Sequence, residues 1–309
     1  MSARTYSGLF PVAPTPFHED GTLDLEGQRR VLDCMIDQQV DGICILANYS
    51  EQFLVSDGER RQLTELCLEQ VAGRVPVMVT CSHFSTRVAA DRARHAADHG
   101  AELIMVMPPY HGANSVVTKI DETAIYEHIA RVAEAAGIPV MIQDAPISGV
   151  NLSIEFLARL ARTLPLVRYF KIEVPGTASK LRKLIEAGGD TIEGPFDGEE
   201  AITMMADLDA GATGVMSSAL LPDLLRPVYD RHREGNRQGA MDAYEKVLPL
   251  VNYENRQCGL RAAKTVMKEG GVIASDAVRH PLAPIEPHTK AGLLELARAA
   301  DPLAIRWGR

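Results

Sequence analysis

The sequence predicts a (β/α)8 barrel followed by a helical extension. Short apolar runs alternate with amphipathic segments eight times along the first 235 residues, and most runs are apolar on both faces, as buried parallel strands are. Neither G-x-G-x-x-G nor G-x-x-x-x-G-K occurs, which disfavours a doubly wound sheet with a phosphate loop. We therefore expect a barrel over residues 1–235 and a helical extension over 236–309.

The expected elements follow from this alternation. The predicted strands are residues 8–13, 42–46, 75–80, 103–107, 140–143, 167–171, 191–193 and 214–217, and the seventh has the fewest apolar residues. The predicted helices are residues 24–38, 56–72, 85–99, 121–136, 153–163, 178–187, 199–208 and 221–233, then 238–250, 258–269 and 289–300 in the extension. Ser56 is a candidate helix cap, and Gly100 and Gly137 are candidate stops.

Composition narrows the class of protein. Aspartate and glutamate (41) exceed lysine and arginine (32), so the net charge is −9, and with no basic run we expect neither nucleic acid nor an anionic membrane as partner. No apolar stretch approaches the ~18 residues of a transmembrane helix, and no signal peptide is recognisable. The five cysteines are widely spaced without a C-x-x-C pair, which favours reduced thiols and a cytoplasmic location.

One lysine closes a predicted buried strand. The active site of a (β/α)8 barrel lies at the carboxyl ends of its strands, and Lys171 ends the sixth. An apolar surrounding disfavours the charged amine, and a neutral amine is what Schiff-base formation with a ketone requires. Glu173 shares a face with Lys171 in an extended segment. Position alone leaves two interpretations open: a reactive amine with a general base, or a structural ion pair.

Several motifs together resemble the dihydrodipicolinate synthase/N-acetylneuraminate lyase family of class I, pyruvate-type aldolases. They are the strand-end Lys171 and the segments 8–17 (GLFPVAPTPF), 108–110 (PPY) and 211–217 (GATGVMS). The resemblance covers almost the whole chain. It implies a (β/α)8 barrel, a homotetramer, and Lys171 as the Schiff-base lysine. Tyr110 matches a family tyrosine that supports proton relay.

Two departures from the family pattern bear on the reaction. The threonines that hold the substrate carboxylate in the family are replaced here by Asn48, Tyr49 and Ser50, which still offer polar donors. The family's proton-relaying tyrosine after strand five is replaced by Gln143, and an amide is neither a general acid nor a general base near neutral pH. Glu173 is then the nearest candidate in sequence for moving protons.

Glutamine in place of the tyrosine, with glutamate two residues after the lysine, resembles the L-2-keto-3-deoxyarabonate dehydratase branch of the family. The resemblance implies conversion of a 2-keto-3-deoxypentonate to 2-oxoglutarate semialdehyde and water, without decarboxylation, in pentose catabolism. Thr15, His83, Gly214 and Ser217 are further candidates for the substrate pocket, although for His83 the position favours a rim residue over a substrate contact. No cofactor is expected, and no metal-ligand spacing such as H-E-x-x-H occurs.

Other functions remain open on the sequence. A Schiff-base aldolase would release pyruvate and an aldehyde, and a decarboxylating dehydratase would release carbon dioxide. A non-catalytic barrel that binds a sugar acid would form no covalent adduct.

Overall fold

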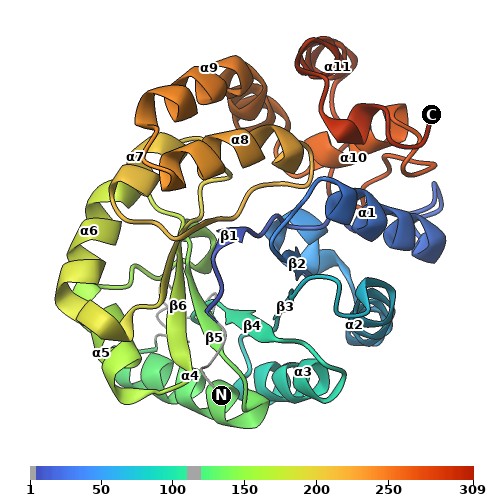
Figure 1. The fold of residues 1–309 in the computed structure, drawn as a ribbon. Helices are drawn as coiled ribbons and strands as arrows, with labels where there is room; N and C mark the ends of the chain where they lie inside the picture. The colour runs from blue at the N-terminus through green and yellow to red at the C-terminus, as the bar shows by residue number, and fades with distance from the viewer. Residues whose placement is uncertain (1–4, 110–119) are drawn as a thin grey trace. The chain divides into compact units, whose positions relative to one another are not determined.

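The computed structural model describes residues 5–109 and 120–309, and Figure 1 shows its helices and strands. The chain forms two compact units. Unit 1 comprises residues 1–7 and 78–216, and unit 2 comprises residues 8–77 and 217–309. Along the described chain, eight strands alternate with eight helices, and three further α-helices follow.

Unit 1 contains a parallel sheet in which strands that are consecutive in sequence lie side by side. The strands are β3 (Val77–Thr80, from Met78 in this unit), β4 (Leu103–Val106), β5 (Val140–Asp144), β6 (Val167–Ile172), β7 (Gly194–Asp197) and β8 (Gly214–Val215). The helices are α3 (Thr86–Asp98), α4 (Glu122–Ala136), α5 (Ile154–Thr163), α6 (Thr177–Gly188) and α7 (Met204–Asp209), with short 3-10 turns η3 (Pro146–Ser148) and η4 (Gly189–Thr191).

Unit 2 joins the first strands to the C-terminal helices. It contains β1 (Gly8–Leu9), α1 (Leu25–Asp37), β2 (Ile43–Ile45), the 3-10 turns η1 (Asn48–Ser50) and η2 (Gln52–Leu54), and α2 (Asp57–Val71). Its C-terminal part contains α8 (Pro222–Arg233), α9 (Arg237–Tyr253), the π-turn η5 (Glu254–Cys258), α10 (Arg261–Glu269), α11 (Pro287–Ala300) and the 3-10 turn η6 (Leu303–Ile305). The prediction of a helical C-terminal part is confirmed.

Local chemistry sets the ends of these helices. Ser56 accepts a hydrogen bond from the Glu59 N–H, and the Glu59 carboxylate accepts one from the Ser56 N–H at 2.8 Å, which is a complete capping box for α2. Gly137 ends α4 in the left-handed region, at φ 66°, which an L side chain rarely adopts. Ser153 caps α5 through the Phe156 N–H.

The seventh strand–helix pair departs from the prediction. β7 occupies Gly194–Asp197 rather than residues 191–193, and α7 begins at Met204 rather than at residue 199. The sequence does not predict a strand at Pro195, because proline is disfavoured in central strands. Glu200 and Ala201 have positive φ values of 51° and 68°, so the helix cannot include them.

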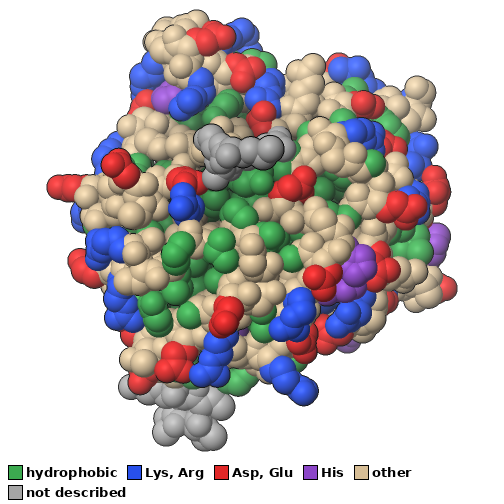
Figure 2. Space-filling model, turned by 60° about the horizontal axis from the view of Figure 1, so that its bottom comes forward, with side chains coloured by type: hydrophobic (Ala, Val, Ile, Leu, Met, Phe, Trp, Pro, Cys, Tyr) green, Lys and Arg blue, Asp and Glu red, His purple; other side chains and the backbone are tan. Residues whose placement is uncertain are grey.

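Charge on the surface is mixed. Figure 2 shows basic and acidic side chains interspersed over the described part of the face in view, so neither sign dominates there. Among the described helices, none combines the length and apolar character that crossing a bilayer requires.

The five cysteine thiols are buried and unpaired with one another, which leads to a labelling prediction. Burial raises the pKa of Cys34 and of Cys67 to about 12, and that of Cys258 to about 11. Because the thiolate is the reactive form, we expect the native protein at pH 8 to resist a thiol-specific disulfide reagent. Unfolding in guanidinium should expose all five thiols. Rapid stoichiometric labelling of the native protein would contradict this expectation.

Candidate active site

Lys171 lies inside the sheet of unit 1. It is opposite Gln143 of β5 and Phe196 of β7 in the strand register, and its side chain is only 2% exposed. Residues opposite one another in register point to the same face of a sheet, and residues i and i+2 of one strand do so as well. This geometry places Gln143, Lys171 and Glu173 on one face, at the carboxyl ends of β5 and β6.

Two carboxylates flank the Lys171 amine. Its Nζ lies 3.1 Å from Glu173 Oε2 and 3.6 Å from Glu200 Oε1. The Glu200 side chain is 8% exposed and the Glu173 side chain 20% exposed, so both carboxylates are largely withdrawn from solvent. The lysine therefore has two neighbouring groups that can exchange a proton with it or with a molecule bound to it.

Gln143 acts on this cluster through Glu173. Its Nε2 donates a hydrogen bond of 2.9 Å to Glu173 Oε2, the same oxygen that faces Lys171. The Glu173 N–H also donates to the Asp144 backbone oxygen at 2.9 Å, which fixes the chain just beyond β6. An amide can orient a carboxylate but cannot accept its proton, so of these two side chains only Glu173 is able to transfer a proton.

Glu200 was not among the residues that the sequence pointed to. The turn after β7 brings it to Lys171 through two successive residues in the left-handed region. Gly198 is required in the same turn, because a Cβ there would lie 2.7 Å from the Ile172 oxygen and 2.8 Å from Lys171 Cγ. Strained backbone of this kind clusters at functional sites. The polar run of residues 197–200 (DGEE) is the sequence signal for this turn, but the same residues also fit the helix predicted from residue 199.

Two buried aspartates are hydrogen-bonded to residues of this turn and of the segment that follows it. Asp197 and Asp207 are fully buried, and Asp197 Oδ1 accepts a hydrogen bond from the Glu199 N–H at 2.9 Å. Thr203 Oγ1 donates to Asp207 Oδ2 at 2.6 Å. Asp197 Oδ2 and Asp207 Oδ1 have no hydrogen-bond partner. Burial, followed by the charge of Asp207, raises the pKa of Asp197, and burial also raises that of Asp207.

A hollow borders the loops that follow β5 and β6. Its volume is about 520 Å³, and it is lined by Pro146, Gly149, Val150, Asn151, Val174, Pro175 and Lys180. Lys180 Nζ lies 2.6 Å from Asp144 Oδ2 and donates to the Leu152 oxygen at 2.6 Å. Val174 directly follows Glu173, so the loop that carries this glutamate borders a space large enough for a small organic acid.

The residues predicted to hold a carboxylate lie in unit 2. Thr15 Oγ1 donates to the Ser50 oxygen at 2.9 Å, and Ser50 Oγ donates to the Ala13 oxygen at 2.6 Å. These hydroxyl protons are thus used in shaping the loop. Asn48 Oδ1 accepts a bond of 2.6 Å from Gln52 Nε2. Asn48 and Tyr49 are partly exposed, unlike Ser50 and Thr15, which are buried.

The other predicted site residues have varied positions. His83 Nδ1 accepts a hydrogen bond from the Ser85 N–H at 2.9 Å, next to the start of α3. Gly214 lies in β8 of unit 1, where a Cβ would collide with the Phe196 ring, and Ser217 is buried in unit 2, where its oxygen accepts from the Val12 N–H. Tyr110 lies outside the described residues.

The buried aspartate pair predicts how stability varies with pH. Folding raises the pKa of Asp197 above its ordinary value of 3.8. Above pH 3.8 the folded protein therefore still holds a proton on this carboxyl that the unfolded chain has released. Stability should therefore fall as the pH rises above that value. Asp197→Asn removes this contribution and keeps the acceptor for the Glu199 N–H. We expect the fall in melting temperature between pH 5 and pH 8 to be smaller in Asp197→Asn by roughly 2 °C or more.

Thermal unfolding followed by circular dichroism across this pH range measures the effect. Asp190→Asn is a suitable control, because Asp190 is exposed in η4. Parallel pH profiles for Asp197→Asn and the unmodified protein would show that Asp197 is ionised in the folded state.

Comparison with known proteins adds independent findings. Residues 5–300 match the model of the dihydrodipicolinate synthetase family. The chain is 55% identical over 306 residues to an L-2-keto-3-deoxyarabonate dehydratase from Azospirillum brasilense, covering 99% of this chain and 98% of that relative. It is 29% identical over 291 residues to a 4-hydroxy-tetrahydrodipicolinate synthase from Bartonella bacilliformis, covering 92% and 94%.

Solved structures show the same fold. A 4-hydroxy-tetrahydrodipicolinate synthase from Methylacidiphilum fumariolicum matches with a TM-score of 0.87 at 22% identity, covering 96% of each chain. A dihydrodipicolinate synthase from Aquifex aeolicus also has a TM-score of 0.87 at 22% identity, covering 96% of this chain and 99% of that one. The predicted (β/α)8 barrel with a helical C-terminal part is confirmed. The chain belongs to the dihydrodipicolinate synthetase family.

Proposed function

We propose that the protein is a dehydratase that converts L-2-keto-3-deoxyarabonate to 2-oxoglutarate semialdehyde and water through a Schiff base on Lys171. One observation carries the proposal: the buried Lys171 amine has two carboxylates beside it, Glu173 and Glu200, and an amide, Gln143, where an aldolase of this family needs a phenol. The 55% identity over nearly the whole chain to an enzyme with this printed activity supports it.

Lys171 begins the reaction by attacking the C2 ketone of the substrate. Either neighbouring carboxylate can take the proton that the amine must lose, since both lie within 4 Å of Nζ. Water leaves the resulting carbinolamine, and a protonated imine forms. The imine draws electrons from C3 and so makes the C3 hydrogens acidic.

Glu173 is the proposed base for C3. Its Oε2 is oriented by the Gln143 amide and lies 3.1 Å from the atom that becomes the imine nitrogen. Removal of a C3 proton gives an enamine. The enamine electrons then return, a C3–C4 double bond forms, and the C4–O bond breaks.

Glu200 is the proposed acid for the departing C4 hydroxyl. Its proton joins that hydroxyl, which leaves as water, so two carboxylates share the acid and base roles that one would otherwise perform alone. A proton is then lost from C5 and one is gained at C3, which moves the double bond to C4–C5. The enol formed there becomes the aldehyde, and hydrolysis of the imine frees Lys171 and the product.

Binding of the substrate carboxylate is assigned to the loop of unit 2 predicted from the sequence. Asn48 and Tyr49 are the proposed donors, while Thr15 and Ser50 hold the loop backbone through their own hydrogen bonds. Supporting roles for Tyr110, His83, Gly214 and Ser217 stay predictions, as do a homotetramer and a cytoplasmic location.

The reaction itself is tested by trapping and product analysis. We expect borohydride with L-2-keto-3-deoxyarabonate to add a mass to the protein, and Lys171→Ala to abolish the adduct. Semialdehyde should accumulate in solution without pyruvate or carbon dioxide. Pyruvate release would instead establish an aldolase, carbon dioxide a decarboxylating enzyme, and an unmodified protein a non-catalytic barrel.

The roles proposed for Glu173 and Glu200 can be distinguished by measuring proton exchange of bound pyruvate and the rate of dehydration. With pyruvate in deuterated water, we expect Glu173→Gln to lose exchange of the methyl protons, because its base is gone. Glu200→Gln should keep that exchange. Both variants should lower dehydration by roughly 10²–10⁴-fold, the usual worth of a general acid or base.

Proton NMR of the pyruvate methyl group and an assay of the semialdehyde measure these effects. Glu199→Gln is the matched control, because Glu199 lies in the same turn but accepts from Thr203 at 3.4 Å. Loss of methyl exchange in Glu200→Gln, or full turnover in either active-site variant, would contradict the division of roles.

A further inference from the structure

Glu51 is an unusual residue in the loop proposed to hold the substrate carboxylate. It joins the two short turns η1 and η2, directly after Asn48, Tyr49 and Ser50. Its backbone is left-handed, with φ 58° and ψ 40°, although it is not a glycine. Such a conformation is strained for a residue with a side chain and persists only where the surroundings enforce it. The cause of this conformation therefore bears on the shape of the whole loop.

The first constraint comes from α10 of the C-terminal extension. Lys264 makes an ion pair with Glu51, and the side chains of both residues are 0% exposed. Lys264 Nζ also donates to the Ala277 oxygen at 2.7 Å and lies 4.5 Å from the centre of the Phe17 ring. Burial lowers the pKa of Lys264, while the Glu51 charge raises it. Removing one member of a buried ion pair leaves the other charge uncompensated, so this pair strongly constrains the position of Glu51.

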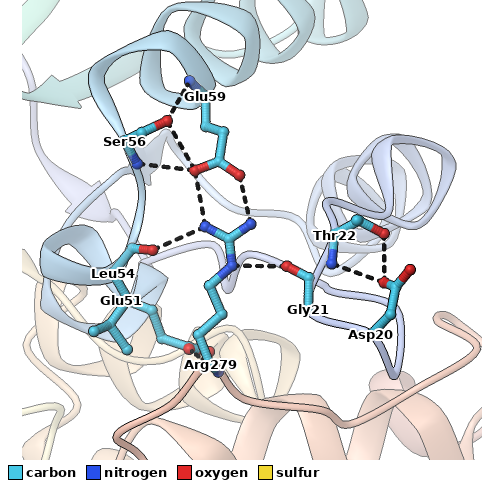
Figure 3. A network of polar contacts seen from close by, with 8 residues as sticks. All are labelled: Asp20, Gly21, Thr22, Glu51, Leu54, Ser56, Glu59 and Arg279. Atoms are coloured by element: carbon cyan, nitrogen blue, oxygen red, sulfur yellow. Dashed lines mark hydrogen bonds and ion pairs between the residues drawn. The ribbon is translucent and has the colours of Figure 1, made fainter.

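The second constraint comes from Arg279, in the segment between α10 and α11 (Figure 3). Its backbone N–H donates to Glu51 Oε2 at 3.0 Å, and its Nη1 donates to the Leu54 oxygen at 2.8 Å. Its guanidinium also makes a two-pronged contact with Glu59, at 2.8 and 2.5 Å. The Arg279 backbone thus contacts Glu51, and its side chain contacts Leu54 and the first turn of α2.

The Arg279 network also reaches the N-terminal part of unit 2. Arg279 Nε donates to the Gly21 oxygen at 2.8 Å, and its Cζ lies 4.3 Å from the Phe17 ring centre, so this ring contacts both cations. Glu59 is at the same time the partner of Ser56 in the α2 capping box. Figure 3 shows the guanidinium surrounded by these acceptors, which come from segments far apart in the sequence.

We propose that Arg279 and Lys264 are positioning residues that hold the 47–54 loop in the conformation that binds the substrate carboxylate. The proposal rests on the proposed function, since it takes this loop as the carboxylate site. The helical extension is then part of the binding machinery, although neither residue touches substrate. The Lys264 amine and the Arg279 backbone N–H converge on one buried glutamate that directly follows the proposed donors, and the Arg279 guanidinium contacts the end of the same loop at Leu54.

A purely structural role makes a different prediction. If the two cations only stabilised unit 2, removing a contact would lower the melting temperature and the amount of folded enzyme without changing the affinity of the folded fraction. A positioning role changes the Michaelis constant of the folded enzyme. It leaves turnover at saturating substrate nearly unchanged, because the acid and base residues, Glu173 and Glu200, lie in unit 1.

Arg279→Lys is the test, because lysine keeps the charge but cannot form the forked contact with Glu59 while also reaching Leu54. We expect the KM for L-2-keto-3-deoxyarabonate to rise roughly tenfold, which corresponds to ~1.4 kcal/mol, while kcat falls less than about twofold. The pyruvate concentration that half-saturates borohydride trapping on Lys171 should rise by a similar factor. This second measurement does not depend on which product the enzyme forms.

Arg30→Lys is the matched control. Arg30 also joins the C-terminal segment to the N-terminal part of unit 2, through the Gly271 and Val272 oxygens and a contact of 5.1 Å with the Trp307 ring. It belongs to α1, so these contacts anchor α1 rather than the loop. Its KM and its half-saturating pyruvate concentration should stay at the values of the unmodified protein. An equal rise in Arg30→Lys, or unchanged values in folded Arg279→Lys, would overturn the positioning role.

The outcomes also separate the two proposals. If the protein forms pyruvate adducts but does not dehydrate the sugar acid, the proposed reaction is wrong. The pyruvate titration would still decide whether Arg279 has a positioning role. A chain that forms neither adduct nor product would overturn both.

Discussion

The site depends on one constraint, which is that a lysine amine inside the sheet must have opposite charge beside it. Placing an ammonium in the interior costs several kcal/mol of solvation, and removing one member of a buried pair typically costs ~3–5 kcal/mol. Glu173 and Glu200 satisfy this requirement for Lys171 from the ends of two neighbouring strands. In the proposed mechanism the same two carboxylates are the base and the acid of the dehydration, so one arrangement would serve both stability and chemistry.

Replacing a phenol by an amide changes the character of such a site. Gln143 keeps a hydrogen-bond donor at the end of β5 but removes a group that can release and regain a proton. The proton-transferring capacity then resides in the carboxylates, and the amide holds one of them in place. Lysine chemistry on one strand can thus be redirected by changing its neighbours, while the barrel that positions them stays the same.

The strained segments of the two units have a common physical feature. The left-handed Glu200 lies in the turn after β7, whose backbone is bonded to the buried Asp197. The left-handed Glu51 separates two turns and is held by contacts with Lys264 and Arg279. In each unit, buried polar contacts hold a backbone conformation that local preference would not choose. Each strained glutamate then occupies a place where its carboxylate meets a buried lysine.

The sequence alone determined the alternation of strands and helices, the helical C-terminal part, and Lys171 with Glu173 and Gln143 at the ends of β5 and β6. These features follow from local patterns, because the spacing of apolar residues and the position of a residue along its strand depend only on residues close by in the sequence. It misplaced β7 and the start of α7, where Pro195 and two left-handed residues break those patterns. Only the tertiary structure decided three further features. They are the position of Glu200 beside Lys171, the hydrogen bond from the Ser50 hydroxyl to the Ala13 oxygen, and the contacts of Arg279 with Glu51 and Glu59. These contacts join residues tens to hundreds of positions apart, and no local preference encodes the backbone turns that bring such residues together.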